Sequence, residues 1–475
     1  MYSRADLEPI LNPTSVAVAG AAPGNLGQLF VDIILGHGFP GRVYPVHPRG
    51  GQISGLQVYA SIEDIPEPVD YVLSCIPARH VPQLIRDCAT KGAKVVCVFT
   101  AGFSETGSRE GRELEREIAC LAKTTGVRVM GPNCMGLYSP RAGLSFTTDF
   151  PRESGAVALI CQSGGNTLYL VRAAAERGVR FSKVVSYGNA CDIDESDLLE
   201  YFVKDADTRI VAAYIEGVKD GRRFSRALKE LAGAKPVIVL KGGYTTEGAG
   251  AAASHTGSLS GSDEVWDAVL EQAGAVRVHR LEEVVDMMVT FSYLSAPRGR
   301  RVGIFGVGGG ASVLATDDCA AAGFVLPPLP QEMQRELRNA VGNDAGLIFG
   351  NPVDFLPRVS SDEAYRHIVR RLLAWDGIDL LLCQVPLRGI MFSLPDACAM
   401  FDSQLGNIVK VAGESIKPMA IVMHYLASGE SWQAATNYQR ICYQAGLPVY
   451  HSGASAMKSV DRLLRYYQGR GVAAV

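Results

Sequence analysis

The stretch VAVAGAAPGNLGQLFVDIIL (residues 16–35) combines an apolar strand, a glycine-rich turn and an amphipathic helix. Its glycines, Gly20, Gly24 and Gly27, follow the spacing GxxxGxxG rather than GxGxxG. Such a turn lets backbone N–H groups and a helix N-terminus approach a phosphate, although a purely structural turn is the alternative. The strand–turn–helix pattern recurs along the chain, and this recurrence predicts α/β domains with mainly parallel sheets.

The apolar runs and helical patterns fall into three successive series within the 475 residues. Polar segments, SPRAGLSFTTDFPRES and SAPRGR, separate the series. We therefore predict three domains, at residues 1–140, 150–295 and 300–475, a number that agrees with the usual size of a domain.

The composition excludes several classes of function. The formal net charge of −3 and the pI of about 6.3 provide no basic surface for nucleic acid or for an anionic membrane. The sequence contains no apolar run of the roughly 18–20 residues that span a bilayer, and its start, MYSRADLEPILNPTS, lacks the apolar core of a signal peptide. The eleven cysteines show neither CxxC nor Cys/His ligand spacing, so we expect reduced thiols, no metal site and a cytoplasmic location.

The end of the second predicted strand, VYPVHPRGG, carries His47 and Arg49. A fold that binds NAD places an acidic residue there to hold the ribose hydroxyls, whereas these two side chains suit a phosphorylated ribose. This favours NADP or coenzyme A over NAD. Open α/β sheets bind ligands beyond the carboxyl ends of their strands, so further strand ends are expected to line the same crevice: Ile76, Pro77, Thr100, Ala101 and Gly102.

The second series begins with ALICQSGGNTLYLVRAAAERG, in which Ser163, Gly164 and Gly165 open a helix after a strand. Unpaired N–H groups and a hydroxyl at such a position can bind a phosphoryl group. The alternative is that Ser163 only caps the helix. The segment YIEG places Glu216 at the carboxyl end of another apolar strand, as a residue of a site or as a solvated loop acid.

A lone imidazole, His255, lies within GAGAAASHTGSLSGSDE (residues 248–264), a long loop of small residues. A neutral histidine is a nucleophile at pH 7 and can carry a phosphoryl group on Nε2 when a carboxylate accepts the Nδ1 proton. Small neighbours would let this loop enter a tight pocket and withdraw again. A phosphate seat and a candidate orienting carboxylate in the same domain support this interpretation over that of an ordinary loop histidine.

Taken in order, the motifs resemble the NDP-forming acyl-CoA synthetases of the succinyl-CoA ligase superfamily. The resemblance is dense over residues 5–295 and looser over 300–475. It is carried by SVAVAGAAPGNLGQ, VYPVHPRGGQISGLQVYASIEDIPEPVDYVLSCIPARHVP, VFTAGFSETG, MGPNCMGLYSP, ICQSGGNTL, SYGNACDIDESDLLEYF, YIEGVKDGRRF and ASHTGSLSGSDEVWDAVLEQAG. It implies a Rossmann-like CoA-binding domain followed by two flavodoxin-like CoA-ligase domains.

The resemblance also implies roles for individual residues. His255 would be transiently phosphorylated, Glu216 would orient its imidazole, and the turn of Ser163, Gly164 and Gly165 would receive the phosphohistidine. The reaction would join a small carboxylic acid and coenzyme A, through an acyl phosphate, with turnover of NTP to NDP. The residues expected at the CoA site are Gly20, Ala21, Gly24, Gly27, His47, Arg49, Ile76, Pro77, Thr100, Ala101, Gly102 and Asn133.

The sequence departs from the family in three respects. It shows no segment resembling the ATP-grasp module, so we expect an α subunit in a hetero-oligomer whose β subunit binds ATP/ADP and Mg²⁺. The third domain has FGVGGGASV where relatives carry an NAGG turn, which leaves the role of Gly308, Gly309 and Gly310 undefined. Arg49 stands where relatives often have Lys. A non-catalytic CoA-binding or regulatory protein of this fold is the first alternative, and an NAD(P)-dependent oxidoreductase is the second.

Overall fold

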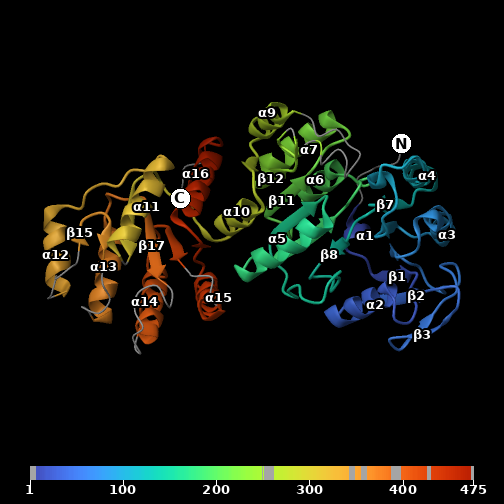
Figure 1. The fold of residues 1–475 in the computed structure, drawn as a ribbon, viewed down its shortest axis with the longest axis horizontal. Coiled ribbons are helices and arrows are strands. Elements are labelled where there is room, and N and C mark those ends of the chain that lie inside the picture. The colour runs from blue at the N-terminus through green and yellow to red at the C-terminus, as the bar shows by residue number, and fades with distance from the viewer. Residues whose placement is uncertain are drawn as a thin grey trace. The chain divides into compact units, whose positions relative to one another are not determined.

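In the computed structural model, the first glycine-rich turn follows the carboxyl end of strand β1 (Ser15–Ala19), which lies within a five-stranded parallel sheet (Figure 1). The strands, in spatial order, are β2 (Arg42–Val46), β1, β5 (Tyr71–Ser74), β6 (Val95–Val98) and β7 (Arg128–Met130). The helical elements of this region are α1 (Glu8–Leu11), α2 (Leu26–His37), η1 (Ala78–His80), α3 (Val81–Lys91), η2 (Ser104–Thr106) and α4 (Arg109–Thr125), and a hairpin is formed by β3 (Gly51–Ile53) and β4 (Leu56–Val58). The chain leaves β1 toward β2 and then crosses to β5 on the other side, so the strand order reverses beside β1, where doubly wound sheets bind ligands.

The strand and helix predicted around the first glycine turn, and the strand predicted in VYPV, are confirmed as β1, α2 and β2. The strands of this sheet are short, valine-rich runs whose residues are almost all buried, as expected for a parallel sheet covered on both faces. Asn25 and Ser108 cap helices α2 and α4 by accepting N–H groups of their first turns, and Gly126 ends α4 in a left-handed conformation. Local rules therefore account for where these helices begin and end.

The second sheet has six strands, in the order β13 (Val276–Val278), β12 (Val237–Lys241), β11 (Ile210–Ile215), β9 (Val157–Cys161), β10 (Phe181–Ser186) and β8 (Gly136–Tyr138). All are parallel except β8, which pairs antiparallel with β10. Its helices are α5 (Gly164–Glu176), α6 (Glu195–Lys204), α7 (Gly221–Ala234) and α9 (Asp263–Ala273). Helix α10 (Leu281–Tyr293) follows β13, and most of it belongs to the C-terminal compact unit, which begins at Val285. The five parallel strands have the flavodoxin-type order, which reverses between β9 and β11. Strand β8 was not predicted, and it lies in the range assigned from the sequence to the first domain.

The third sheet repeats this order, as β15 (Ile348–Phe349), β16 (Val353–Asp354), β14 (Val302–Gly306), β17 (Leu380–Pro386), β18 (Met419–His424) and β19 (Val449–Tyr450). Here β15 is the antiparallel edge strand. The helices are α11 (Gly309–Ala321), α12 (Gln331–Val341), α13 (Asp362–Ala374), α14 (Ala397–Ala412), α15 (Gly429–Gln444) and α16 (Gly453–Gln468). The prediction of an α/β fold, with one Rossmann-like and two flavodoxin-like sheets, is therefore confirmed.

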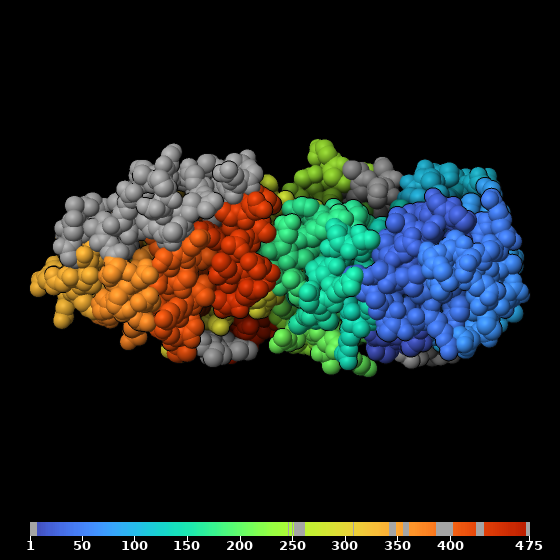
Figure 2. Space-filling view, turned by 90° about the horizontal axis from the view of Figure 1, so that it is seen from below, coloured from blue at the N-terminus to red at the C-terminus, as the bar shows by residue number. Residues whose placement is uncertain are grey.

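The structure describes residues 7–245, 247, 248, 250, 262–306, 308–341, 348–354, 361–386, 397–424 and 429–471. These residues form two compact units. One unit comprises Met1–Ala175 and Arg180–Val284 and contains the first two sheets, and the other comprises Glu176–Val179 and Val285–Val475. Within the first unit, the surfaces of the blue and green residues, which belong to the first and second sheets, adjoin (Figure 2).

Candidate functional site

The first glycine turn joins β1 to α2 and is held by hydrogen bonds from several directions. The N–H groups of Gly20 and Ala21 donate to the Val46 carbonyl at 2.8 and 3.1 Å, which ties the turn to the end of β2. The Asn25 side chain accepts the Ala22 N–H at 3.1 Å and donates to the Gly20 carbonyl at 2.7 Å. These backbone N–H groups have hydrogen-bond partners within the protein, so the turn has its shape before any ligand binds.

Two glycines of this turn leave no room for a side chain. A Cβ on Gly27 would lie 2.6 Å from both the Gly20 carbonyl oxygen and the Ala21 Cα. A Cβ on Gly20, whose φ is +92°, would lie 3.0 Å from the Cys75 carbonyl oxygen at the end of β5. By contrast, Gly24, with φ +76°, faces open space, and its N–H donates to Oε1 of Gln28 at 2.7 Å. Close packing of helix on turn and an open edge at Gly24 are the features that a bound pyrophosphate requires of such a turn.

The two polar residues after β2 differ in their surroundings. His47 is half-buried, and its Nδ1 accepts the Arg49 N–H at 3.2 Å. Because Nδ1 is the acceptor in this bond, the neutral ring carries its proton on Nε2, which is thereby available to donate to an anion. Arg49 itself is exposed. The structure therefore places a hydrogen-bond donor and a guanidinium two residues apart at this strand end.

The remaining residues predicted for the CoA site lie in a row at the carboxyl edge of the first sheet. The Thr100 hydroxyl donates to the Ile76 carbonyl at 2.7 Å, and the Asn133 N–H donates to the Thr100 carbonyl at 3.2 Å. Gly102 has φ +111°, and Asn133, at φ +58°, is one of the non-glycine residues with a left-handed backbone. These bonds bring the ends of β5, β6 and β7 together beside the glycine turn, with Pro77 and Ala101 exposed.

The second glycine turn begins α5 where the order of the second sheet reverses. The Ser163 hydroxyl accepts the Asn166 N–H at 3.3 Å, so this serine does cap the helix. The Ser163 carbonyl accepts the N–H and the hydroxyl of Thr167 at 2.9 and 2.7 Å. A Cβ on Gly164 would approach Met135 Cγ to 3.0 Å, whereas Gly165 is exposed with nothing near it. The first turn of α5 is thus open at Gly165.

Glu216 directly follows β11, which pairs with β9, and its side chain is buried rather than solvated, with 7% of the residue exposed. The Tyr214 hydroxyl donates to Glu216 Oε1 at 3.2 Å. Oε1 of Gln162 accepts the N–H groups of Glu216 and of Gly217, the latter at 3.1 Å, and its Nε2 donates to the Gly217 carbonyl at 3.2 Å. Burial and the neighbouring Glu216 carboxylate raise the pKa of Tyr214, so its phenol stays protonated and remains a donor.

The sequence analysis missed three side chains that surround Glu216: Gln162, Tyr214 and Lys241. Lys241 ends β12 and is 2% exposed. Its Nζ donates to the carbonyls of Gly242 and Gly243, the latter at 3.3 Å, and lies 5.7 Å from the centre of the Trp266 ring. Burial lowers the pKa of this lysine, although Asp263 and Glu216 act in the opposite direction. A charged residue that ends an apolar strand, the signal used for Glu216, also marks Lys241.

The predicted nucleophile, His255, lies outside the described residues. The flanks of its segment are described: Tyr244 contacts the His279 ring at 5.5 Å between centroids, and the Ser262 side chain caps α9. The phosphorylation of His255 therefore remains a prediction.

The glycine turn of the third sheet differs from the other two. The Gly308 N–H donates to Oδ1 of Asp354 at 2.8 Å, and a Cβ on Gly309 would lie 3.6 Å from Oδ2 of the same carboxylate. Asp354 is buried at the end of β16. Here the protein's own carboxylate, rather than an open edge, faces the start of α11.

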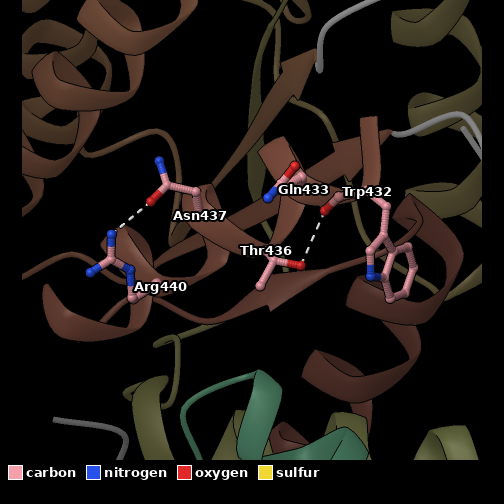
Figure 3. A pocket seen from close by; sticks show the side chains of 5 residues that line it. All are labelled: Trp432, Gln433, Thr436, Asn437 and Arg440. Atoms are coloured by element: carbon pink, nitrogen blue, oxygen red, sulfur yellow. Dashed lines mark hydrogen bonds between the residues drawn. The ribbon is translucent and has the colours of Figure 1, made fainter. Parts of the chain in front are cut away.

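A separate surface hollow follows one face of α15 (Figure 3). It is lined by Trp432, Gln433, Thr436, Asn437 and Arg440, and the Arg440 guanidinium donates to Asn437 Oδ1 at 2.7 Å. None of these five residues was predicted to belong to a site. Among the described helices, none has the length and apolar character needed to cross a bilayer.

Two family models match the first two sheets. The model described as a CoA binding domain matches residues 14–140, and that of a succinyl-CoA ligase like flavodoxin domain matches residues 154–291. The α subunit of acetate–CoA ligase [ADP-forming] I from Pyrococcus furiosus is 35% identical over 97% of both chains. Acetate–CoA ligase [ADP-forming] I from Archaeoglobus fulgidus is 34% identical over 97% of this chain, which spans 64% of that relative.

A solved structure agrees with these relatives. The dinucleotide-forming acetyl-coenzyme A synthetase 1 of Ca. Korarchaeum cryptofilum, determined in complex with phosphate and ADP, superposes with a TM-score of 0.82. The two chains are 31% identical, and the alignment covers 98% of each. The matches do not favour an NAD(P)-dependent oxidoreductase. The chain therefore belongs to the NDP-forming acyl-CoA synthetases, as a homologue of the α subunits of the ADP-forming acetate–CoA ligases.

Proposed function

We propose that this chain is the subunit of an ADP-forming acid–thiol ligase that binds coenzyme A and carries the phosphoryl group on His255. One observation carries the proposal most directly. The buried Glu216 carboxylate and the open turn at Gly165 lie just beyond the carboxyl ends of two adjacent parallel strands, β11 and β9, at the point where the strand order of the second sheet reverses. A phosphohistidine that moves between two positions needs a carboxylate to orient its ring and an anion-binding turn to receive its phosphoryl group. Both lie here on neighbouring strand ends, where open α/β sheets bind ligands.

The chemistry follows from these groups. Glu216 would accept the Nδ1 proton of His255, which leaves Nε2 with a lone pair to attack the phosphorus of an acyl phosphate. The P–O bond to the acyl group breaks, the acid leaves as a carboxylate, and the phosphoryl group stays on Nε2. In the opposite direction the carboxylate attacks phosphohistidine, and the thiolate of coenzyme A then displaces phosphate from the acyl phosphate. N–H groups of the first turn of α5 would stabilise the phosphoryl oxygens during transfer.

Coenzyme A would occupy the carboxyl edge of the first sheet. Its pyrophosphate would lie at the open edge of the first glycine turn, at Gly24. The exposed guanidinium of Arg49 and the Nε2 donor of His47 would bind the phosphorylated ribose. The other residues proposed to contact it are Gly20, Ala21, Gly27, Ile76, Pro77, Thr100, Ala101, Gly102 and Asn133.

The nucleotide half of the reaction would belong to a partner. The Pyrococcus relative is named an α subunit, and the Archaeoglobus relative is a longer single chain of which this chain spans 64%. Both facts support a β subunit as the partner. We assign to it the ATP-grasp module that binds ATP/ADP and Mg²⁺, and we place the hetero-oligomer in the cytoplasm. Acetate, the acid in the names of these relatives, is the first small carboxylic acid to assay.

A labelling experiment tests the proposal. The chain is incubated with its β subunit and with ATP labelled at the γ-phosphate, and the expected label on the chain is acid-labile and base-stable. His255→Ala should abolish it, whereas His367→Ala, which removes a half-exposed histidine on α13 of the third sheet, should not. Label that survives His255→Ala would refute the assignment, and CoA binding without any label would point to the non-catalytic alternative.

A further inference from the structure

Asn189 lies in the turn that follows β10, and its side chain reaches the first sheet. The residue is 6% exposed, and its Nδ2 donates to Oε2 of Glu105 at 2.6 Å and to Oε2 of Glu115 at 2.8 Å. One neutral amide therefore separates two carboxylates. An aspartate in its place would add a third negative charge and remove both donors.

Glu105 uses its other carboxylate oxygen to shape the loop after β6. Oε1 accepts the N–H groups of Gly102 and Phe103 at 2.6 and 3.1 Å, with Gly102 at φ +111°. Burial would raise the pKa of Glu105, but the hydrogen bonds from Asn189 and from these N–H groups outweigh it and hold the pKa below its ordinary value. An ionised Glu105 thus fixes the backbone of the strand end to which coenzyme A is assigned.

The backbone of the same turn fixes a second strand end. The Asn189 N–H donates to the Pro132 carbonyl at 3.0 Å, and the Cys191 N–H donates to the Gly131 carbonyl at 2.9 Å. A Cβ on Gly188 would lie 2.2 Å from the Pro132 carbonyl oxygen, so this approach requires glycine. The turn therefore lies directly against the residues that precede Asn133.

The other end of the turn is bound to the second sheet. The Tyr187 N–H donates to the Cys161 carbonyl at 3.1 Å, two residues before Ser163. Lys219 Nζ donates to the Asn189 carbonyl at 3.0 Å. Hydrogen bonds and short backbone segments thus connect the strand end before the phosphate turn, through Tyr187, Asn189 and Glu105, to Gly102.

We propose that Asn189 is a positioning residue for coenzyme A, a role that rests on the CoA site proposed above. Asn189 does not itself touch coenzyme A in this scheme. It holds Glu105 in the orientation that shapes the Thr100–Gly102 loop, and it fixes that loop relative to the second sheet. Loss of the amide should therefore weaken CoA binding while leaving the phosphorylation of His255, which does not involve coenzyme A, unchanged.

The test compares Asn189→Ala, Asn189→Asp and the pair Asn189→Asp with Glu105→Gln. The affinity of the purified chain for coenzyme A is measured by calorimetry, and the rate of His255 labelling and the KM for coenzyme A are measured with the β subunit present. Asn189→Ala should raise the Kd and KM about tenfold, the effect of removing a hydrogen bond to a charged group. Asn189→Asp should be worse. In the double variant the amide stands at position 105 and the carboxylate at position 189, so the hydrogen bond between the two side chains can form again. Part of the lost affinity for coenzyme A should therefore return.

Asn407→Ala is the matched control, because Asn407 is also a buried asparagine that donates to a carboxylate, Asp362 Oδ1 at 3.0 Å, but in the other unit. It should leave the Kd for coenzyme A within about twofold. A wild-type Kd in both Asn189 variants would overturn the inference, as would equal losses of CoA binding and His255 labelling, which indicate a general structural role. Failure of the wild-type chain to bind coenzyme A would instead refute the proposed CoA site.

Discussion

The Tyr214 hydroxyl lies 3.2 Å from Oε1 of Glu216, two residues further along the same chain, and donates a hydrogen bond to it. The two side chains flank the carbonyl end of β11, at which the carboxylate is buried. The phenol donor holds the carboxylate in place at this strand end, and the carboxylate in turn acts against the burial that lowers the pKa of Lys241. A carboxylate fixed in this way can accept a hydrogen bond from the Nδ1–H of a histidine.

Glu216→Gln should slow the phosphorylation of His255 by about 100-fold, because a neutral amide cannot stabilise the positive charge that develops on the imidazole as Nε2 attacks. The unfolding temperature should change little, since the Gln162 bonds to the backbone of residues 216 and 217 remain. Tyr214→Phe keeps the carboxylate and loses one hydrogen bond to it, so its effect should be smaller, about tenfold. Rapid-quench labelling measures both rates, and an unchanged rate in Glu216→Gln would remove this residue from the mechanism.

Arg49→Ala should weaken the binding of coenzyme A about tenfold, through loss of a charge-assisted bond to the 3′-phosphate of its ribose. Dephospho-CoA lacks that phosphate, so its affinity should be the same for wild type and variant. Arg109→Ala removes another exposed guanidinium, on α4, and controls for the change in net charge. Calorimetric titration measures the affinity for both ligands. Equal losses of affinity for coenzyme A and dephospho-CoA would show that Arg49 does not bind the 3′-phosphate.

How far the sequence predicted this structure depended on whether the signal was local. The strands ending at Ala19, Val46 and Cys161 are apolar runs followed by polar or glycine-rich turns, and they were predicted nearly to the residue. The strand Gly136–Tyr138 has only three residues and exists because it pairs with β10, so no local pattern marks it.

In the site, too, the features that depend on local sequence were predicted and those that depend on distant residues were not. A carboxylate at the end of an apolar run was visible in the sequence at Glu216, but the Gln162 side chain that holds the backbone of residues 216 and 217 follows a different strand. Likewise, no property of the letters SYGNA indicates that Asn189 reaches Glu105, because the two residues are 84 positions apart and meet only in the folded unit.

Gly27→Ala should destabilise the first unit by roughly 1–3 kcal/mol and weaken CoA binding, because its Cβ would overlap backbone atoms of Gly20 and Ala21. Gly36→Ala is the matched control, since Gly36 lies in the same helix and a Cβ added there would meet no other atom within 4 Å. The control should be neutral or stabilising by up to about 1 kcal/mol, the difference in helix propensity. Urea unfolding of both variants measures the contrast, and equal effects would show that the turn tolerates a side chain.

Glu195→Gln should change how stability depends on pH. Glu195 is 2% exposed at the start of α6, and burial together with repulsion by Asp194 raises its pKa to about 8. Between the ordinary glutamate pKa of about 4.3 and pH 8, the folded protein therefore keeps a proton that the unfolded chain has released. Folding stability consequently falls as pH rises through this window, by up to about 1.4 kcal/mol per pH unit. Glutamine does not titrate, so the variant should gain stability relative to wild type as pH rises from 5 to 8. Thermal unfolding at half-unit pH intervals measures the difference, in which the contributions of the other titrating groups cancel, and parallel curves for the two proteins would show that Glu195 is ionised in the fold.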